Sequence, residues 1–186
     1  MKRFFDIFVS IFALAVFSPV FLLCTLAVRL SSKGPAFYVS DRIGANNTHF
    51  DMLKFRTMRI DTPQVATHLL SDPKAFLTPV GNFLRKSSLD ELPQLINVVK
   101  GEMSIVGPRP ALFNQEDQIS LRTKSGAHVL VPGITGWAQV NGRDDIPIAR
   151  KVELDTWYLH NHSFWLDIKI IFMTIANVFK GSGVSH

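Results

Sequence analysis

Two adjacent carboxylates, Asp90 and Glu91, stand near the start of a predicted short helix, and cations flank them along the chain. Arg85 precedes the pair, and Arg109 follows it in a Pro-Arg-Pro segment. Helix N-termini and arginine side chains bind phosphate, because they offer N–H donors and positive charge. A carboxylate in such a place could attack phosphorus if the cations offset the repulsion between like charges. The pattern is therefore compatible with phosphoryl transfer.

Helix capping explains the same two carboxylates without catalysis. Asp90 could be the N-cap, or Ser88 and Glu91 could form a capping box, and either arrangement would satisfy unpaired amides and the helix dipole. The helix itself is predicted over residues 92–100, between a proline in its first turn and a glycine after its end. Judged from the carboxylate pair alone, capping is the favoured interpretation.

The same pair could hold a metal ion. Mg²⁺ needs only one or two carboxylates in addition to phosphate oxygens, so Asp90 and Glu91 are the candidate ligands. Lys54 and Arg56 at the end of a predicted strand, and Arg143 in an Asn-Gly-Arg loop, are candidate phosphate-binding residues. Taken singly, each of these cations is explained equally well by a solvated basic face.

Composition limits the classes of protein to be considered. The 186 residues are enough for one domain, and 20 Lys and Arg against 15 Asp and Glu favour anionic partners. The single cysteine excludes an intrachain disulfide framework and a zinc site built on several thiolates. With 47% hydrophobic and 19% charged residues and no recognisable nucleic-acid module, we expect no nucleic acid among the partners.

Much of the apolar excess lies in a run near the start, from Ile7 to Val28, which contains no charge. A straight helix of this length would reach about 33 Å, enough to cross the hydrocarbon core of a bilayer. Ser18 and Pro19 interrupt the run at its middle, where proline must kink a helix. Because both flanks are basic, the positive-inside rule gives no orientation for a spanning helix. A re-entrant hairpin is therefore favoured over a straight span, with a signal peptide and a buried core helix as weaker alternatives.

The remainder of the chain is predicted to be an α/β (α+β) domain with short helices, a small β-hairpin and many loops. This gives a membrane hairpin over residues 1–33 and a second domain over 34–186. Strands are predicted at 36–39, 50–58 and 137–140, a turn at 44–47, an irregular loop at 62–79, and further helices at 111–124, 149–160 and 164–179.

Motifs along nearly the whole chain resemble those of the bacterial sugar transferase family, the monotopic polyprenyl-phosphate phosphoglycosyl transferases. The shared motifs are Lys2-Arg3-x-x-Asp6, Ser18-Pro19, Gly34-Pro35-x-Phe37, Lys54-Phe55-Arg56-Thr57-Met58, Leu89 to Leu95, Met103 to Pro110 and Pro132 to Arg143. In this order they are highly specific. Larger family members add N-terminal transmembrane helices and a further domain, so we expect this chain to be the minimal catalytic form.

The resemblance implies a two-step reaction on the cytoplasmic face of the bacterial inner membrane. Asp90 would attack the β-phosphorus of a UDP-sugar, release UMP and then pass the phosphosugar to undecaprenyl phosphate. Glu91 would assist with Mg²⁺ or with proton handling, and Arg85, Arg109 and Arg143 would hold phosphates or nucleotide. Membrane lipid is a further expected partner, and homodimerisation stays open. The rival hypothesis is a noncatalytic, membrane-anchored module that binds anionic lipid.

Overall fold

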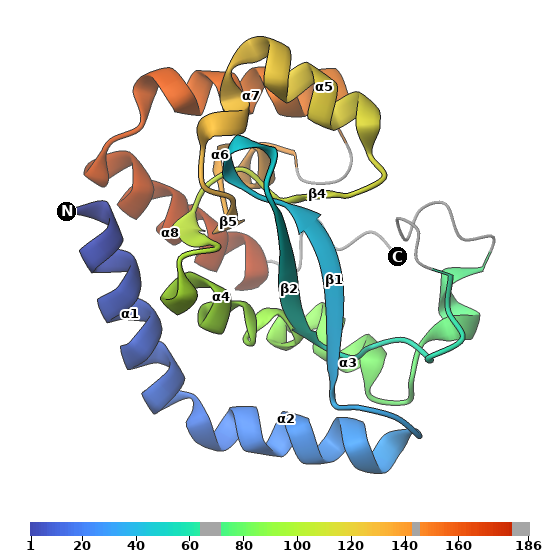
Figure 1. Ribbon diagram of the computed structural model, residues 1–186. Coiled ribbons are helices and arrows are strands. Elements are labelled where there is room, and N and C mark those ends of the chain that lie inside the picture. Colours follow the sequence, from blue (N-terminus) through green and yellow to red (C-terminus); the bar gives the residue numbers. More distant parts are fainter. Residues whose placement is uncertain (64–71, 143–145, 180–186) are drawn as a thin grey trace.

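The computed structural model describes residues 1–63, 72–142 and 146–179, which form helices around two small sheets (Figure 1). In the first sheet, β1 (Phe37–Ile43) pairs antiparallel with both β2 (His49–Phe55) and β4 (Ala111–Leu112). In the second, β3 (Ser104–Val106) and β5 (Gly133–Thr135) run parallel. This confirms the predicted mixture of short helices with a small sheet.

The β1–β2 hairpin has the predicted turn. A 3₁₀ turn, Ala45–Asn47, joins the strands, and both of its asparagines adopt left-handed backbone conformations. Asparagine tolerates this region better than most residues do, which explains the Gly-Ala-Asn-Asn sequence. The second strand ends at Phe55, and Met58 forms only an isolated bridge with Leu77, so the predicted strand was too long.

Short helices surround the sheets. They are α3 (Gly81–Lys86), α4 (Gln94–Lys100), α5 (Glu116–Ser125), α6 (Trp137–Val140), α7 (Ile148–Asn161) and α8 (Phe164–Phe179), with 3₁₀ turns at Pro73–Phe76, Leu89–Glu91 and Ala127–Val129. The last two helices agree with the prediction to within one residue. Gly101 ends α4 in the left-handed conformation that a C-terminal glycine provides.

Two predicted elements were wrong. The segment 111–124 begins with β4, which pairs with the end of β1, and the helix starts only at Glu116. The predicted strand at 137–140 is the helix α6, because Trp137 and Val140, three residues apart, both pack on the core around Tyr158. Four residues are too few to distinguish a helical period from a strand period by sequence.

The apolar run near the N-terminus forms two helices, α1 (Lys2–Val16) and α2 (Ser18–Ser31), that bend by 65° at the predicted break. Pro19 has no N–H for the carbonyl of Ala15, and Ser18 Oγ donates a hydrogen bond of 2.8 Å to that oxygen instead. Among the described residues, no unbroken helix has both the length and the apolar character that a membrane crossing requires.

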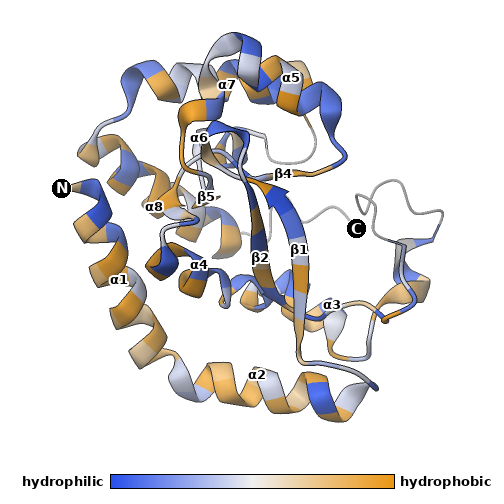
Figure 2. Cartoon of the chain, viewed as in Figure 1, coloured by the Kyte–Doolittle hydropathy of each residue, from blue (hydrophilic) through white to orange (hydrophobic). Residues whose placement is uncertain are grey.

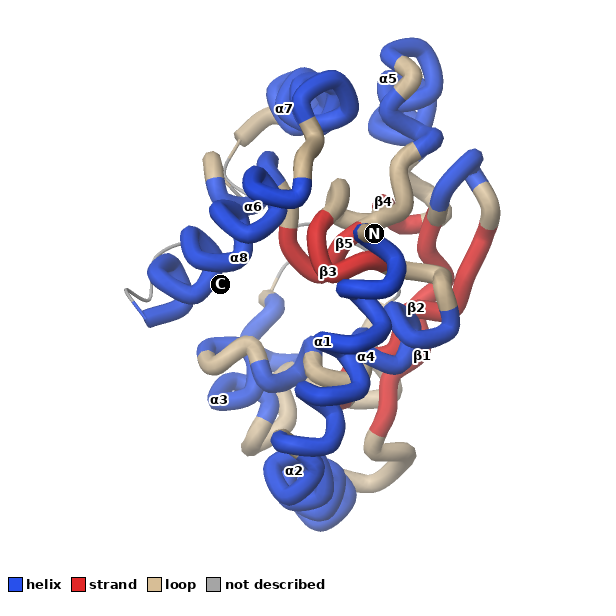
Figure 3. The backbone as a smooth tube through the Cα atoms, turned by 90° about the vertical axis from the view of Figure 1, so that its left-hand side faces the viewer, coloured by secondary structure: helices blue, strands red, loops and turns tan. Residues whose placement is uncertain are grey.

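Both ends of this helix pair are attached to the same globular body (Figure 3). At the start of α1, Lys2 Nζ lies 2.6 Å from a carboxylate oxygen of Asp167 on α8, and Arg3 donates to carbonyl oxygens of α4. After α2, the guanidinium of Arg56 donates to the carbonyl oxygens of Ser32 and Lys33. Both ends of the helix pair are therefore bound to the same domain.

The helix pair also exposes an apolar surface, visible as the orange stretches of α1 and α2 in Figure 2. Its members, which we call the hairpin surface, are Phe4, Phe8, Ile11, Phe12, Val16, Phe17, Leu22, Leu23, Leu26 and Leu30. On the opposite side of α2, Cys24 and Val28 are buried against Phe55 and Leu84. The pair is thus packed on the domain along one side and presents large apolar side chains on the other.

Candidate active site

Asp90 lies in the 3₁₀ turn between α3 and α4, and its side chain is buried, with 8% exposure. Ser88, just before this turn, has a left-handed backbone conformation with φ of 56°. The Ser88 side chain makes no capping hydrogen bond at this turn, and α4 begins after Pro93, not after Asp90, without a side-chain cap. The capping interpretation of Asp90 and Glu91 was therefore wrong.

Glu91 links residues from two other parts of the chain. Its Oε1 atom accepts a hydrogen bond of 2.7 Å from Lys54 Nζ on β2, and lies 3.4 Å from both terminal nitrogens of Arg109. The Lys54 and Glu91 side chains are largely buried, so water screens this pair less than it would at the surface. Glu91 thereby holds two predicted phosphate-binding cations close to the Asp90 turn.

The pKa of Asp90 is raised, and burial is the main cause, because desolvation disfavours the charged carboxylate. Lys54 opposes this effect, Glu91 adds to it, and Arg85 and Arg109 oppose it. The structure therefore gathers the predicted residues Lys54, Arg85 and Arg109 around this carboxylate. A buried carboxylate among cations has the electrostatic surroundings expected for a group that meets phosphate.

Sequence reasoning missed Arg42 and Tyr38, which share this environment. On β1 their side chains lie on the same face, and Tyr38 stands directly opposite Lys54 on β2. Arg42 donates to Ser40 Oγ and to the carbonyl oxygen of Pro110, while burial and the charge of Arg109 lower its pKa to about 10. The alternation of β1 was the available signal, since it places these two residues on one face with Lys54.

Two predicted cations occupy different positions. Arg85 Nε donates to Thr57 Oγ1 over 3.0 Å, and the guanidinium influences the charge of Asp90, so it borders the site. Arg56 is buried and directed toward the end of α2, where it binds Ser32 and Lys33. Its observed contacts attach the helix pair to the domain and do not bring it to Asp90. Arg143 lies outside the described residues.

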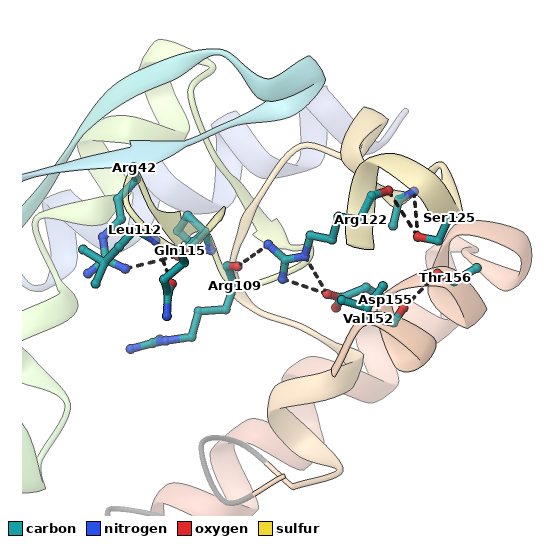
Figure 4. Close-up of polar contacts among 11 residues, drawn as sticks. Arg42, Arg109, Leu112, Gln115, Arg122, Ser125, Val152, Asp155 and Thr156 are labelled. Atoms are coloured by element: carbon teal, nitrogen blue, oxygen red, sulfur yellow. Dashed lines mark hydrogen bonds and ion pairs between the residues drawn. The ribbon is translucent and has the colours of Figure 1, made fainter. Parts of the chain in front are cut away.

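Arg109 is positioned through its backbone by a buried ion pair (Figure 4). Its carbonyl oxygen accepts a hydrogen bond of 2.9 Å from Arg122 Nη1, on α5. Arg122 also donates to Asp155 Oδ2 on α7, over 3.0 and 2.7 Å. Figure 4 shows the Arg109 side chain pointing away from Arg122. The pair thus fixes the segment that carries Arg109 and leaves its guanidinium directed elsewhere.

A pocket of about 190 Å³ adjoins these charged residues. Glu91 and Arg109 lie in its wall, with Ser88 from the turn before them. Leu92, just after the 3₁₀ turn, also lines it. The remaining wall is contributed by α4, β5, α6 and α8, through Leu95, Ile134, Thr135, Gln139, Val140, Thr174, Asn177 and Val178. The pocket therefore has a charged end beside the Asp90 turn and a mainly uncharged interior.

No group of three or more His, Cys, Asp or Glu side chains that could hold a metal is found within the described ranges. Mg²⁺ requires less than this, because it is commonly bound by one or two carboxylates together with substrate phosphates. Asp90 and Glu91 are hard oxygen donors in adjacent positions, beside cations suited to phosphate. Their chemistry therefore fits Mg²⁺ that arrives with a phosphorylated substrate.

Comparison with known proteins places this site in a family. A family model described as bacterial sugar transferase matches residues 1–181. The chain belongs to the bacterial sugar transferase family. The resemblance drawn from the sequence motifs is thereby confirmed, and it extends over both the bent helix pair and the domain that carries Asp90.

Relatives of this family member differ in length. The uncharacterized sugar transferase EpsL of Bacillus subtilis (strain 168) is 44% identical over 188 residues, which cover all of this chain and 91% of the relative. The exopolysaccharide production protein ExoY of Rhizobium meliloti (strain 1021) is 42% identical over 98% of this chain and 87% of its own. The UDP-glucose:undecaprenyl-phosphate glucose-1-phosphate transferase of Escherichia coli (strain K12) is 43% identical over 97% of this chain, but only 40% of that protein is covered.

Proposed function

We propose that this family member transfers a sugar 1-phosphate from a UDP-sugar to undecaprenyl phosphate, giving undecaprenyl-diphosphate-sugar and UMP. The observation that carries the proposal is the buried Asp90 carboxylate with Lys54, Arg85 and Arg109 around it. The names of relatives support the reaction class, since one is a UDP-glucose:undecaprenyl-phosphate glucose-1-phosphate transferase and another an exopolysaccharide production protein. The product would enter bacterial glycoconjugate synthesis at its first membrane step.

The reaction would proceed in two displacements at phosphorus. An oxygen of ionised Asp90 forms a bond to the β-phosphorus of the UDP-sugar, and the bond from that phosphorus to the bridging oxygen breaks, so UMP leaves with the electron pair. A phosphate oxygen of undecaprenyl phosphate then attacks the same phosphorus, and the bond to Asp90 breaks. The carboxylate is regenerated, and the sugar phosphate remains on the lipid.

The surrounding residues would favour both displacements by electrostatics. Lys54, Arg85 and Arg109 would reduce the repulsion between the carboxylate and the phosphate oxygens, and would stabilise the charge on the departing UMP. Glu91 would keep Lys54 and Arg109 in place through the contacts described above. Arg143 is a further proposed phosphate or nucleotide contact.

Mg²⁺ is the proposed cofactor, and Asp90 and Glu91 would hold it. When bound, the ion would supply positive charge to the phosphate oxygens. Chelation with EDTA tests this directly, because turnover should fall to background and return when Mg²⁺ is restored in excess. Full turnover after chelation would exclude a need for a divalent cation.

We propose a place in one leaflet of the inner membrane, with the site on the cytoplasmic side, and the bent helix pair supports the single-leaflet part of this proposal. Both ends of α1–α2 are bound to the same domain, and the hairpin surface is apolar. An enzyme held in this way would meet the lipid phosphate of undecaprenyl phosphate at the interface. We therefore propose residues 1–33 as a re-entrant membrane hairpin and 34–186 as the catalytic domain.

The decisive experiment is Asp90→Asn in the purified chain, with undecaprenyl phosphate and a panel of UDP-sugars. UMP release should fall by about 10³-fold or more, because the amide cannot act as the nucleophile. Asp61→Asn, at an exposed ion pair with Arg59, is the matched control and should keep full turnover. If Asp90→Asn retained turnover, Asp90 would not be the nucleophile.

The alternative, a noncatalytic module that binds anionic lipid, predicts a different pattern. Such a module would release no UMP from any UDP-sugar in the unsubstituted chain. It would also bind vesicles containing anionic lipid equally well before and after Asp90→Asn, so the two readouts together separate the functions.

A further inference from the structure

We propose that Arg42, together with Arg109, binds the phosphate group that leaves with the nucleotide, which is the phosphate attached to uridine in a UDP-sugar and retained in UMP. The inference rests on the proposed function and deepens it, because it adds a binding residue for one of the two donor phosphates. The observation behind it is a guanidinium on β1 that lies beside Arg109, has no carboxylate partner within the described part of the chain and keeps one nitrogen unbonded.

Neutral oxygen atoms hold Arg42 in place. Its Nε atom donates to Ser40 Oγ over 3.0 Å, and its Nη1 atom donates to the carbonyl oxygen of Pro110 over 3.2 Å. None of the ion pairs between described residues includes Arg42. A guanidinium that is partly withdrawn from water is normally compensated by an anion, because its charge is costly to bury. Within the described residues, Arg42 thus lacks the anion that a guanidinium in its position usually has.

The third nitrogen of this guanidinium, Nη2, is available to a ligand. Both observed bonds use the other two nitrogens, so Nη2 has no partner among the described residues. The enclosed side-chain polar atoms that lack a partner in the same residues do not include it, so Nη2 reaches solvent. Nε and Nη1 fix the plane of the guanidinium, which therefore presents Nη2 in a set direction. This arrangement is pre-organised to donate a hydrogen bond to an anion.

Arg109 brings a second positive charge to the same place. Pro110, which accepts the bond from Arg42, directly follows Arg109 in the chain, and Figure 4 shows both arginine side chains to the left of the Arg109 backbone. Burial lowers the pKa of Arg42 and the charge of Arg109 lowers it further, while Tyr38 and Glu91 oppose this. Two neighbouring guanidinium groups repel each other unless an anion offsets their charges. Phosphate suits this position, because its oxygens accept hydrogen bonds from several arginine nitrogens at once.

The position of Arg42 along β1 indicates which phosphate this is. Phe37, at the start of β1, packs against an aromatic ring of α2 at a centroid separation of 5.8 Å. Lys54, which binds Glu91 beside Asp90, lies opposite the second residue of β1. Arg42 lies farther along the same strand, about 16 Å from Phe37 at the usual rise. The order along the strand is therefore the helix pair, the Asp90 turn and then Arg42.

This order separates the two phosphorylated substrates. Undecaprenyl phosphate is held in the bilayer by its tail, so its phosphate would approach from the helix pair, where the hairpin surface lies. The nucleotide is the soluble part of the donor and would occupy the opposite side of the Asp90 turn. Arg42 and Arg109 lie on that side, so they would bind the phosphate between uridine and the phosphorus that Asp90 attacks. Their charge would then stabilise the negative charge that develops on UMP as it leaves.

The test is Arg42→Met, assayed in both half-reactions and in UMP binding. We expect kcat/KM for the UDP-sugar that the unsubstituted chain uses best to fall about 10- to 100-fold, since a charge-assisted hydrogen bond to phosphate is lost. The Kd of UMP, measured by calorimetry, should rise by a similar factor. The value of kcat/KM for undecaprenyl phosphate should stay unchanged, because UMP has left before the lipid phosphate attacks. Arg150→Met, at an exposed ion pair with Glu153, is the matched control and should change none of these constants.

Three results would overturn the inference. The first is a lower kcat/KM for undecaprenyl phosphate with an unchanged Kd of UMP, since Arg42 would then contact the lipid phosphate. The second is an equal loss in both half-reactions, which a purely structural role through Pro110 would give. The third is unchanged kinetics and unchanged UMP binding. Arg42→Lys provides the same comparison if the methionine variant does not fold, because lysine keeps the charge but cannot bond Ser40, Pro110 and a phosphate at once.

The inference and the proposed function fail in different ways. If the unsubstituted chain released UMP from a UDP-sugar but Arg42→Met kept its kcat/KM for the UDP-sugar and its Kd of UMP, only the role of Arg42 would be wrong. If the unsubstituted chain released no UMP from any UDP-sugar, the proposed function would be wrong, whereas a Kd of UMP that rose in Arg42→Met would still show Arg42 at a nucleotide phosphate.

Discussion

The carboxylate of Asp6, in the first turns of α1, accepts a hydrogen bond of 2.8 Å from Ser104 Oγ on β3. It also accepts a weaker bond of 3.3 Å from the backbone N–H of Ile105. Ser104 and Asp6 are both buried, and β3, which begins at Ser104, continues into the segment that carries Arg109. The bent helix pair is therefore bonded directly to the strand that leads into the candidate site.

Replacing Asp6 with alanine should destabilise the protein. The N–H of Ile105 would lose its acceptor, and the buried Ser104 hydroxyl would lose its shorter bond and keep only the carbonyl oxygen of Val106 at 3.0 Å. The cost should be about 1–3 kcal/mol in the free energy of unfolding. For a chain of this size, that corresponds to a decrease in Tm of roughly 3–10 °C. Thermal unfolding in detergent measures it, with Asp61→Ala, at the exposed ion pair with Arg59, as a control. An unchanged Tm would mean that the Asp6 contact contributes no net stability.

Asp90→Asn should make the protein more stable at neutral pH while it abolishes turnover. Burial raises the pKa of Asp90, so the folded protein binds this proton more tightly than the unfolded chain does. Above the raised pKa, the charged carboxylate lowers stability, and asparagine removes that cost. The gain in Tm should be full at pH values well above the raised pKa, decrease as the pH falls through it, and vanish near the unfolded value of about 3.9. A gain that grew toward acid pH would contradict this sign.

Lys54→Met should move the acid limb of the pH profile of kcat/KM to higher pH. Lys54 is the largest of the neighbouring charges that lower the pKa of Asp90, so its loss would raise that pKa further. Turnover should then fall more on the acid limb than on the plateau of the profile, because less Asp90 is ionised on the acid limb. Lys54→Arg keeps the charge and should leave the limb near its original position. An unmoved limb in Lys54→Met would mean that ionisation of Asp90 does not limit the reaction.

How far the sequence could predict this structure depended on the range of the interactions involved. The break at Ser18-Pro19 was predictable, because it depends on the missing N–H of Pro19 and on a hydroxyl one residue away. The strand β4 was not, because it exists through its pairing with β1, far away in the sequence. Rules that use neighbouring residues predict a local helix break, but they contain little information about pairing between strands that are far apart in the sequence.

In the candidate site, too, residues identifiable from the local sequence were predicted, and those placed by contacts between distant segments were not. Asp90, Glu91, Arg85 and Arg109 were identified because their types and order suggest phosphate chemistry. Arg56 was grouped with them by sequence proximity to Lys54, yet the chain leaves β2 at Phe55 and turns its guanidinium toward Ser32. Its role in attaching the helix pair depends on a contact between distant segments. Arg42 was missed because its place beside Arg109 depends on how β1 packs, and the local sequence does not show this.

Asp155→Ala should be strongly destabilising and should also impair the site. Asp155 is buried, and its loss would leave the Arg122 guanidinium as an uncompensated buried charge, at a cost of about 3–5 kcal/mol. Since Arg122 also binds the carbonyl oxygen of Arg109, turnover should fall even at temperatures where the variant remains folded. Tm and UMP release measure the two effects. The control is Glu153→Ala, at an exposed ion pair on the same helix, which should change Tm little. If Asp155→Ala changed Tm as little, the buried pair would not be essential for stability.

Cysteine labelling tests the re-entrant arrangement of the helix pair. In a Cys24→Ala background, single cysteines at Lys2 and Lys33 should react equally with a membrane-impermeant maleimide added to the cytoplasmic side. The reason is that both ends of α1–α2 are bound to the same domain. A cysteine at Phe12, on the hairpin surface, is the control and should be protected from both sides, because this side chain would lie in lipid. Labelling of positions 2 and 33 from opposite sides would instead mean that the helix pair spans the membrane. The contacts by which Lys2 and Arg56 attach the two ends of the pair to the domain could not then both be present.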